Sequence, residues 1–199
     1  MAYKTEKILV VPAHKLFELG RWSGIVSDHR IAHIVKCVQT CGNFLDRAAM
    51  ESDESYKQII PYVVLTYGDN VFVMERADNA SEKRLRSKVS IGVGGHVRAD
   101  DFSKIEQFSA DSIDWFKREL DEEIAGVEIK HVTFLGALND DSNEVGRVHC
   151  GVIYRIELAH PHVSIRDEHK SGVLMPQAQT REKYDSMEEW SKLVMDVLK

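Results

Sequence analysis

Short apolar runs separated by turn-forming residues mark the expected strands along the chain. The run Ile59 to Leu65 is followed by the tripeptide Gly68-Asp69-Asn70 and then by the run Val71 to Glu75. Two β-branched runs joined by such a turn are typical of a β-hairpin. Residues 89–93 alternate in polarity and end at a glycine pair, which predicts another strand. Further apolar runs predict strands at residues 7–12, 129–138 and 148–158.

In other segments apolar residues recur every three or four positions, which is typical of helices with one buried side. The segment from His29 to Met50 predicts one or two helices, with an interruption near Gly42. The last helix is expected from Ser186 to Leu198, with Ser186 as its N-cap. Its inward-facing residues are expected to be Trp190, Leu193, Val194, Val197 and Leu198.

A third helix is predicted from Asp111 to Ala125. Either Asp111 or Ser112 is suited to cap its start, and Gly126 is suited to end it. Its apolar positions form one stripe and are Ile113, Phe116, Leu120 and Ile124.

The elements follow the order strands, helix, strands, helix, with mostly hairpin-like connections. This order favours an α/β fold in the loose sense, or α+β, with a mixed sheet between helices, over a doubly wound parallel sheet. At 199 residues the chain is long enough for one substantial core. We expect a main domain over residues 56–199 and an N-terminal extension over residues 1–55, made of a strand and helix, that supplies a lid or an interface, for example in a homodimer.

Composition narrows the class of protein further. The 43% of hydrophobic and 29% of charged residues are ordinary for a globular protein. The apolar runs are far shorter than the roughly 20 residues that cross a bilayer, no signal peptide is evident, and the three cysteines form no CxxC pair. These features predict a cytoplasmic protein without membrane contact. A net charge of −6 argues against nonspecific binding of nucleic acid.

Three glutamates share one side of the predicted helix at 111–125. Helical periodicity places Glu119, Glu122 and Glu123 on a flank away from the apolar stripe. Like charges at this spacing cost a few tenths of a kcal/mol per pair, and a bound divalent cation would reverse that cost. The residue Arg118 is placed to hold one carboxylate through a bidentate ion pair. Taken alone, these residues also fit an ordinary solvated helix face.

The surroundings of these glutamates add a family resemblance. Gly95, Arg118-Glu119-Leu120, Glu122-Glu123 and Gly126-Val127 lie in an order that resembles the Nudix box of the MutT-like pyrophosphohydrolases. That box is a glycine, five residues, a glutamate, seven residues, and then Arg-Glu-apolar-x-Glu-Glu-x-Gly-apolar. The likeness is close over the box and loose over the region from Pro61 to Leu158. It does not extend to Met1 to Glu54.

This sequence departs from the Nudix pattern in three ways. The stretch from Gly95 to Arg118 is longer, and two residues rather than one separate Glu123 from Gly126. Ala110 stands where the family has its first glutamate. The candidates to replace that glutamate are Asp111 and Glu106.

The resemblance implies a Nudix-like α/β/α sandwich over residues 56–199 and a reaction in which water attacks a phosphorus atom. It implies a pyrophosphate substrate in which a nucleoside diphosphate is linked to another moiety, or a similar phosphoester. Magnesium, or Mn²⁺ in its place, would be held by Glu119, Glu122, Glu123 and the carbonyl of Gly95. The implied catalytic residues are Arg118, Glu119 and Glu122.

The resemblance leaves the remaining roles open among a few residues. The general base is Glu119 or a later glutamate, and Glu144 and Glu168 are the later candidates. The candidates to bind substrate phosphates, besides a surface or structural role, are Arg76, Arg98 and His96.

Two other sets of residues suggest metal sites. His29, His33, Cys37 and Cys41 recur every four residues, but along one helix they span about 18 Å and cannot enclose one ion, so a packed helix face is favoured. The second set, which also fits an exposed loop, is His160, His162 and His169. A further alternative is a noncatalytic Nudix-like binding or regulatory module, because the first glutamate of the box is missing.

Overall fold

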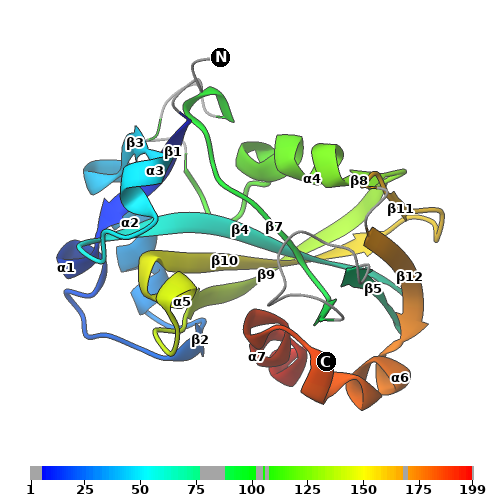
Figure 1. Cartoon of the computed structure of the whole chain (residues 1–199). Coiled ribbons are helices and arrows are strands. Elements are labelled where there is room, and N and C mark those ends of the chain that lie inside the picture. The colour runs from blue at the N-terminus through cyan, green and yellow to red at the C-terminus, as the bar shows by residue number, and fades with distance from the viewer. Residues whose placement is uncertain (1–5, 77–87, 102–104, 106–107, 168–169, 199) are drawn as a thin grey trace. The chain divides into compact units, whose positions relative to one another are not determined.

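The computed structural model describes residues 6–76, 88–101, 105, 108–167 and 170–198 (Figure 1). The chain forms two compact units. The first unit contains Met1–Pro61, Gly95–Arg118 and Phe134–Val152, and the second contains Tyr62–Gly94, Glu119–Thr133 and Ile153–Lys199.

In the first unit, β1 (Lys7–Pro12) lies between two antiparallel partners. It pairs with β3 (Asn43–Asp46) on one side and with the start of β4 (Tyr56–Tyr67) on the other. Its residues Ile8, Leu9, Val10 and Val11 are fully buried, which explains the uninterrupted apolar run. The predicted strand at 7–12 is confirmed.

The helices of the first unit are short. Those described include α1 (Ala13–Leu16), α2 (Arg30–Cys41), α3 (Arg47–Met50), α5 (Glu144–Val148) and the 3-10 turn η2 (Ala99–Asp101). A small strand, β2 (Gly24–Val26), pairs with β9 (Ile129–Asn139).

The prediction of helix across residues 29–50 is partly wrong. Helix α2 ends at Cys41, and the next residue, Gly42, has an extended backbone with ψ 143°. The next residues form β3 because Phe44 pairs with Leu9 and Leu45 with Ile8 of β1, a long-range ladder that local periodicity does not reveal.

In the second unit, the predicted hairpin is confirmed. The end of β4 pairs with β5 (Asn70–Arg76) across Gly68 and Asp69, and β12 (Lys170–Pro176) pairs with the other side of β5. The single strand predicted at 89–93 is two strands instead. β6 (Val89–Ser90) pairs with β5 and β7 (Val93–Gly94) with β4, because the chain bends where Ser90 Oγ bonds the Gly92 amide.

The predicted helix at 111–125 is shorter at both ends. A 3-10 turn, η4 (Asp114–Phe116), leads into α4 (Lys117–Glu123). Ser112 Oγ accepts a hydrogen bond from the Asp114 amide, but the N-cap of the 3-10 turn is Ile113, so the N-cap predicted at Asp111 or Ser112 is wrong. After α4, the chain forms β8 (Ile124–Ala125), which pairs with β11 (Ser164–Ile165).

The C-terminal part holds α6 (Gln177–Glu182), the 3-10 turn η5 (Tyr184–Ser186) and α7 (Glu189–Val197). The predicted last helix therefore begins late, and Ser186 Oγ donates to the carbonyl of Lys183 instead of capping α7. Val194 and Leu198 are buried as predicted, whereas Val197 is 41% exposed.

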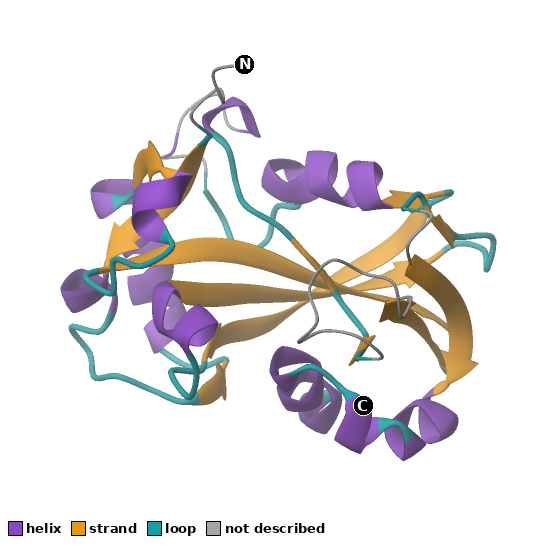
Figure 2. Ribbon diagram, in the orientation of Figure 1, coloured by secondary structure: helices purple, strands orange, loops and turns teal. Residues whose placement is uncertain are grey.

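The strand order is β12-β5-β4-β10-β9-β2, with β10 (His149–Leu158) confirming the strand predicted near its position. Figure 2 shows long strands accompanied by short helices. The chain is a mixed α/β protein, as its sequence predicts. No described helix combines the length and the apolar character needed to cross a membrane.

Candidate functional site

Helix α4 carries the glutamates that the sequence singles out. Phe116, Leu120 and Ile124 are each at most 3% exposed and fix one side of this segment, while Ile113 is only partly buried. Spacings of three and four residues place the Glu119, Glu122 and Glu123 side chains near one another along the helix. Glu122 is exposed, and the other two glutamates are half-buried. Within the second unit, three carboxylates therefore share a short, well-anchored helix.

In the first unit, Arg118 holds the loop that follows Gly95. Its Nε and one terminal nitrogen donate to the two oxygens of Asp101, at 2.7 and 2.9 Å, and it also donates to the His96 carbonyl at 3.1 Å. The Asp101 side chain is 4% exposed and also accepts from the Arg98 amide. Arg118 thus makes a bidentate pair with the carboxylate of Asp101, a residue outside the glutamate cluster for which the pair was predicted. Asp101 was missed because it lies in an irregular polar stretch.

The turn after α4 requires a glycine. Gly126 has φ +77°, and a Cβ built there would lie 2.3 Å from the backbone oxygen of His162. A non-glycine residue would therefore meet both backbone strain and a collision with the main chain.

Replacing Gly126 with Ala should lower the free energy of unfolding by about 2 kcal/mol or more, because left-handed strain and the His162 collision add. Urea denaturation of the variant would measure this. The matched control is Gly68→Ala, since Gly68 has φ +54° but nothing within 4 Å of its Cβ position. If both variants lose the same free energy of unfolding, the collision with His162 adds nothing to the left-handed strain, and this prediction is wrong.

Half-buried His96 lies beside the ring of buried His149. Its Nε2 is 2.7 Å from Gln58 Oε1, and its ring centre is 5.7 Å from that of His149. His149 Nδ1 donates to the Val145 carbonyl at 2.6 Å. Burial, helped by the Arg47 and His149 charges, lowers the pKa of His96 to about 4, and burial likewise lowers the pKa of His149. At neutral pH, His96 is a neutral ring in a structural hydrogen bond.

Acid should destabilise the protein through His96. Its folded pKa of about 4 lies below the ordinary value of 6.5, so the unfolded chain takes up the proton first and stability falls as pH drops below 6.5. We expect a loss of roughly 1 to 2 kcal/mol between about pH 7.5 and about pH 5, measured by urea unfolding. His96→Gln should flatten this dependence. An unchanged slope in that variant would assign the acid sensitivity to other groups.

The other predicted phosphate ligands have different surroundings. Arg98 Nε donates to Glu6 at 2.7 Å, and Glu6 also accepts from Arg47 at 2.9 Å. The Arg47 hydrogen bond, opposed by burial and joined by that of Arg98, lowers the pKa of Glu6. Arg98 would have to share its guanidinium with Glu6 to bind a phosphate. Arg76 ends β5 opposite Lys170, and its side chain lies outside the described part of the structure.

Of the candidates for the general base and for the missing glutamate of the box, the structure describes some and not others. Glu144 begins α5 in the first unit and is exposed, and Asp111 is exposed before η4. Glu168 and Glu106 lie outside the described residues.

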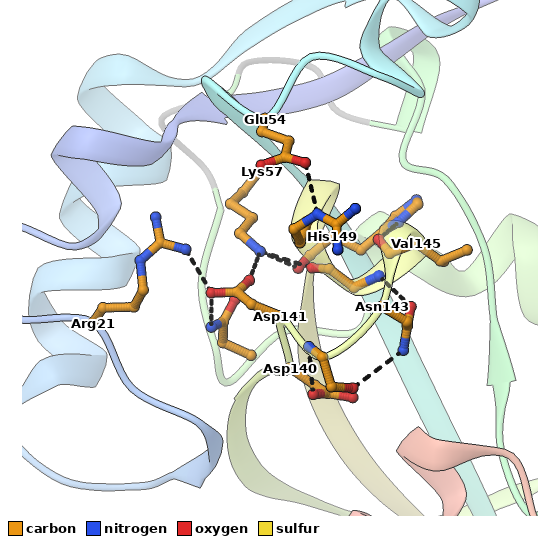
Figure 3. A network of polar contacts seen from close by, with 12 residues as sticks. Arg21, Glu54, Lys57, Asp140, Asp141, Asn143, Val145 and His149 are labelled. Carbon is orange, nitrogen blue, oxygen red and sulfur yellow. Dashed lines mark hydrogen bonds and ion pairs between the residues drawn. The ribbon is translucent and has the colours of Figure 1, made fainter.

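A buried lysine in the first unit was not anticipated from the sequence. Lys57 has no exposed surface, and its Nζ donates to Asp141 Oδ1 at 2.6 Å and to the carbonyls of Gly146 and His149 (Figure 3). Burial lowers the pKa of Lys57, while Asp141 opposes that shift. Burial raises the pKa of Asp141, but hydrogen bonds from Lys57, Arg21 and Asn139 outweigh it and leave that pKa below its ordinary value.

Among the residues that the structure describes, neither alternative metal set forms a metal site. Cys37 is buried on α2, burial raises the pKa of its thiol to about 12, and His33 bonds the Lys15 carbonyl, so this helix face serves packing. His160 pairs with Glu128, and His169 lies outside the described residues. Across the described ranges, no three His, Cys, Asp or Glu side chains are arranged to hold a metal ion.

The chemistry of α4 still fits magnesium. Glu119, Glu122 and Glu123 offer only oxygen donors, which Mg²⁺ prefers. Proteins commonly bind this ion through one or two carboxylates, with water and substrate phosphates completing the shell. A cage of three protein ligands is therefore not required.

The chain resembles several known proteins. No protein-family model matches it. It is 33% identical over 211 residues to protein YmaB of Bacillus subtilis (strain 168), covering 100% of both chains. The crystal structure of Tm1382, described as a candidate Nudix hydrolase, has a TM-score of 0.80 and 29% identity, covering 96% of this chain and 97% of that one. The chain belongs to the Nudix hydrolase family.

Nudix hydrolases are pyrophosphohydrolases, and the family predicted from Gly95 and the residues around Arg118 is confirmed. Another known structure is similar to this chain in its fold only. It is a bifunctional NMN adenylyltransferase/ADP ribose pyrophosphatase from Francisella tularensis, complexed with AMP and a manganese ion, with a TM-score of 0.51 and 14% identity over 71% of this chain and 41% of that one.

Proposed function

We propose that this Nudix protein is a magnesium-dependent hydrolase that cleaves the pyrophosphate bond of a nucleoside diphosphate linked to another moiety. The observation that carries the proposal is helix α4, where Glu119, Glu122 and Glu123 stand together on a helix anchored by buried Leu120. In a Nudix chain, this is the part of the sequence that matches the box.

Each residue of the box has a separate task in this proposal. Glu119, Glu122 and Glu123 would hold Mg²⁺ or Mn²⁺, and the carbonyl of Gly95 stays a predicted further ligand. When bound, the ion lowers the pKa of water and offsets the charge of the diphosphate. Glu119, Glu144 or Glu168 would accept the proton of the attacking water. Arg118 acts indirectly, because its side chain holds the loop after Gly95 through Asp101 and the His96 carbonyl.

The charge of the chain supports a need for a cation. A formal net charge of −6 makes the protein repel a diphosphate at long range, and the carboxylates of α4 strengthen that repulsion locally. A bound divalent cation would offset both the long-range and the local repulsion of the diphosphate. Cytoplasmic location and a homodimer built through residues 1–55 stay predictions.

The proposal is tested by measuring phosphate or nucleotide release from a panel of compounds with Mg²⁺, with Mn²⁺ and with a chelator. The panel holds ADP-ribose, dinucleotide cofactors, nucleotide sugars, nucleoside triphosphates and non-nucleotide diphosphates. We expect metal-dependent turnover of at least one diphosphate-linked nucleoside. Folded protein that turns over none of them and binds no Mg²⁺ would instead indicate a noncatalytic Nudix-like binding module.

A further inference from the structure

The end of the glutamate helix is held by a segment distant in sequence. In the second unit, Arg166 Nε donates to the Asp121 carbonyl at 2.8 Å, and the Arg166 backbone amide donates to the Glu123 carbonyl at 2.9 Å. These carbonyls belong to the last turn of α4, whose oxygens have no partner within the helix. One residue thus satisfies two of them.

The same segment fixes the chain directly after α4. β11 pairs with β8, with Ile165 opposite Ile124 and Ser164 opposite Ala125 (Figure 1). The close approach of Gly126 to His162 then ends the ladder. Because β8 follows Glu123 without a gap, any fraying of the last turn must also break contacts with β11.

Arg166 also supplies a positive charge at the C-terminal end of α4. The helix, which the structure describes in full, has no basic residue in its last turn, although cations there favourably oppose the helix dipole. The guanidinium brings that positive charge to the end of a segment that contains Asp121, Glu122 and Glu123. It therefore opposes both the dipole and the mutual repulsion of the carboxylates.

We propose that Arg166 is a positioning residue for the metal-binding glutamates of α4. By bonding the Asp121 and Glu123 carbonyls, it keeps the last turn helical and so sets the directions from which the Glu122 and Glu123 side chains leave the backbone. Residues that orient ligands in this indirect way commonly affect metal affinity. This inference rests on the proposed function, because it takes these two glutamates as ligands.

The test uses the full chain, Mn²⁺ alone as the binding probe, and no substrate. Binding of Mn²⁺ is followed by electron paramagnetic resonance, and backbone hydrogen exchange is followed over residues 117–125. Arg166→Ala should weaken Mn²⁺ binding about three- to tenfold and speed exchange in the last turn of α4. Arg166→Lys, which keeps the charge, should recover part of both losses.

The control is Lys130→Ala, which removes an exposed cation of β9 that pairs with Glu157, and it should change neither readout. If Arg166→Ala folds poorly, Arg166→Gln gives the same test with a neutral donor. Unchanged Mn²⁺ binding in the Arg166 variants would overturn the inference, even with faster exchange, because the residue would then only stabilise the helix. If the unaltered protein binds no Mn²⁺ and hydrolyses nothing, the proposed function itself fails.

Discussion

Replacing Glu122 with Gln is expected to reduce metal-dependent hydrolysis roughly 100-fold or more. A bound divalent ion contributes several kcal/mol to transition-state stabilisation, and each 1.36 kcal/mol corresponds to about a tenfold change in rate. Gln keeps the size of the side chain but removes the negative charge that attracts Mg²⁺. Because Glu122 is exposed, the change should leave the fold intact. The rate is measured with the substrate that the panel identifies, over a range of Mg²⁺ concentrations.

Glu123→Gln should show the same loss, since both glutamates belong to the pair that matches the Nudix box. The control is Glu189→Gln on α7, whose side chain is 58% exposed and pairs with Lys192. That variant should hydrolyse the substrate at the rate of the unaltered protein. Full activity in both α4 variants would show that the ion is held elsewhere and would remove the main support for the proposed site.

Asp141→Ala should destabilise the first unit by about 3 kcal/mol. Removing this carboxylate leaves the ammonium of Lys57 buried without its ionic partner, and breaking a buried pair in this way is costly. Lys57→Met should cost less, about 1 to 2 kcal/mol, because no buried positive charge remains and Asp141 keeps its bonds from Arg21 and Asn139. Urea denaturation gives both values.

The double variant Lys57→Met/Asp141→Ala separates the two effects. It should be no less stable than Asp141→Ala alone, since the unpaired charge is gone. Glu54→Ala serves as control, because Glu54 forms an exposed pair with Arg147 that should contribute under about 1 kcal/mol. Losses that simply add in the double variant would mean that Lys57 and Asp141 do not stabilise each other.

Local spacing explains what the sequence predicted well. The glutamates follow the helical period and Phe116, Leu120 and Ile124 are buried, so α4 and its two sides could be derived directly, although only Leu120 of the three lies in α4 itself. The β4–β5 hairpin likewise depends on a turn between neighbouring runs. Both features are encoded within a few consecutive residues.

Long-range pairing explains what was missed. Lysine is rarely buried, and the Asp141 partner of Lys57 lies 84 positions away, so nothing near Lys57 indicates the ion pair. Arg166 contacts Asp121 from 45 positions away. Helical spacing predicts helix where β3 forms for the same reason, since pairing with β1 decides the conformation of these residues. Spacing along the chain carries no information about such partners.

The two-residue strand β8 explains why two residues, and not one, separate the last glutamate of the Nudix box from its closing glycine. Ile124 and Ala125 stand where the family has a single residue, and both are used in the ladder with β11 before Gly126 turns the chain past His162. The longer spacing and the glycine therefore depend on each other. Proteins that share this ladder should be recognisable among genomes by a box with two residues, not one, between its last glutamate and its closing glycine.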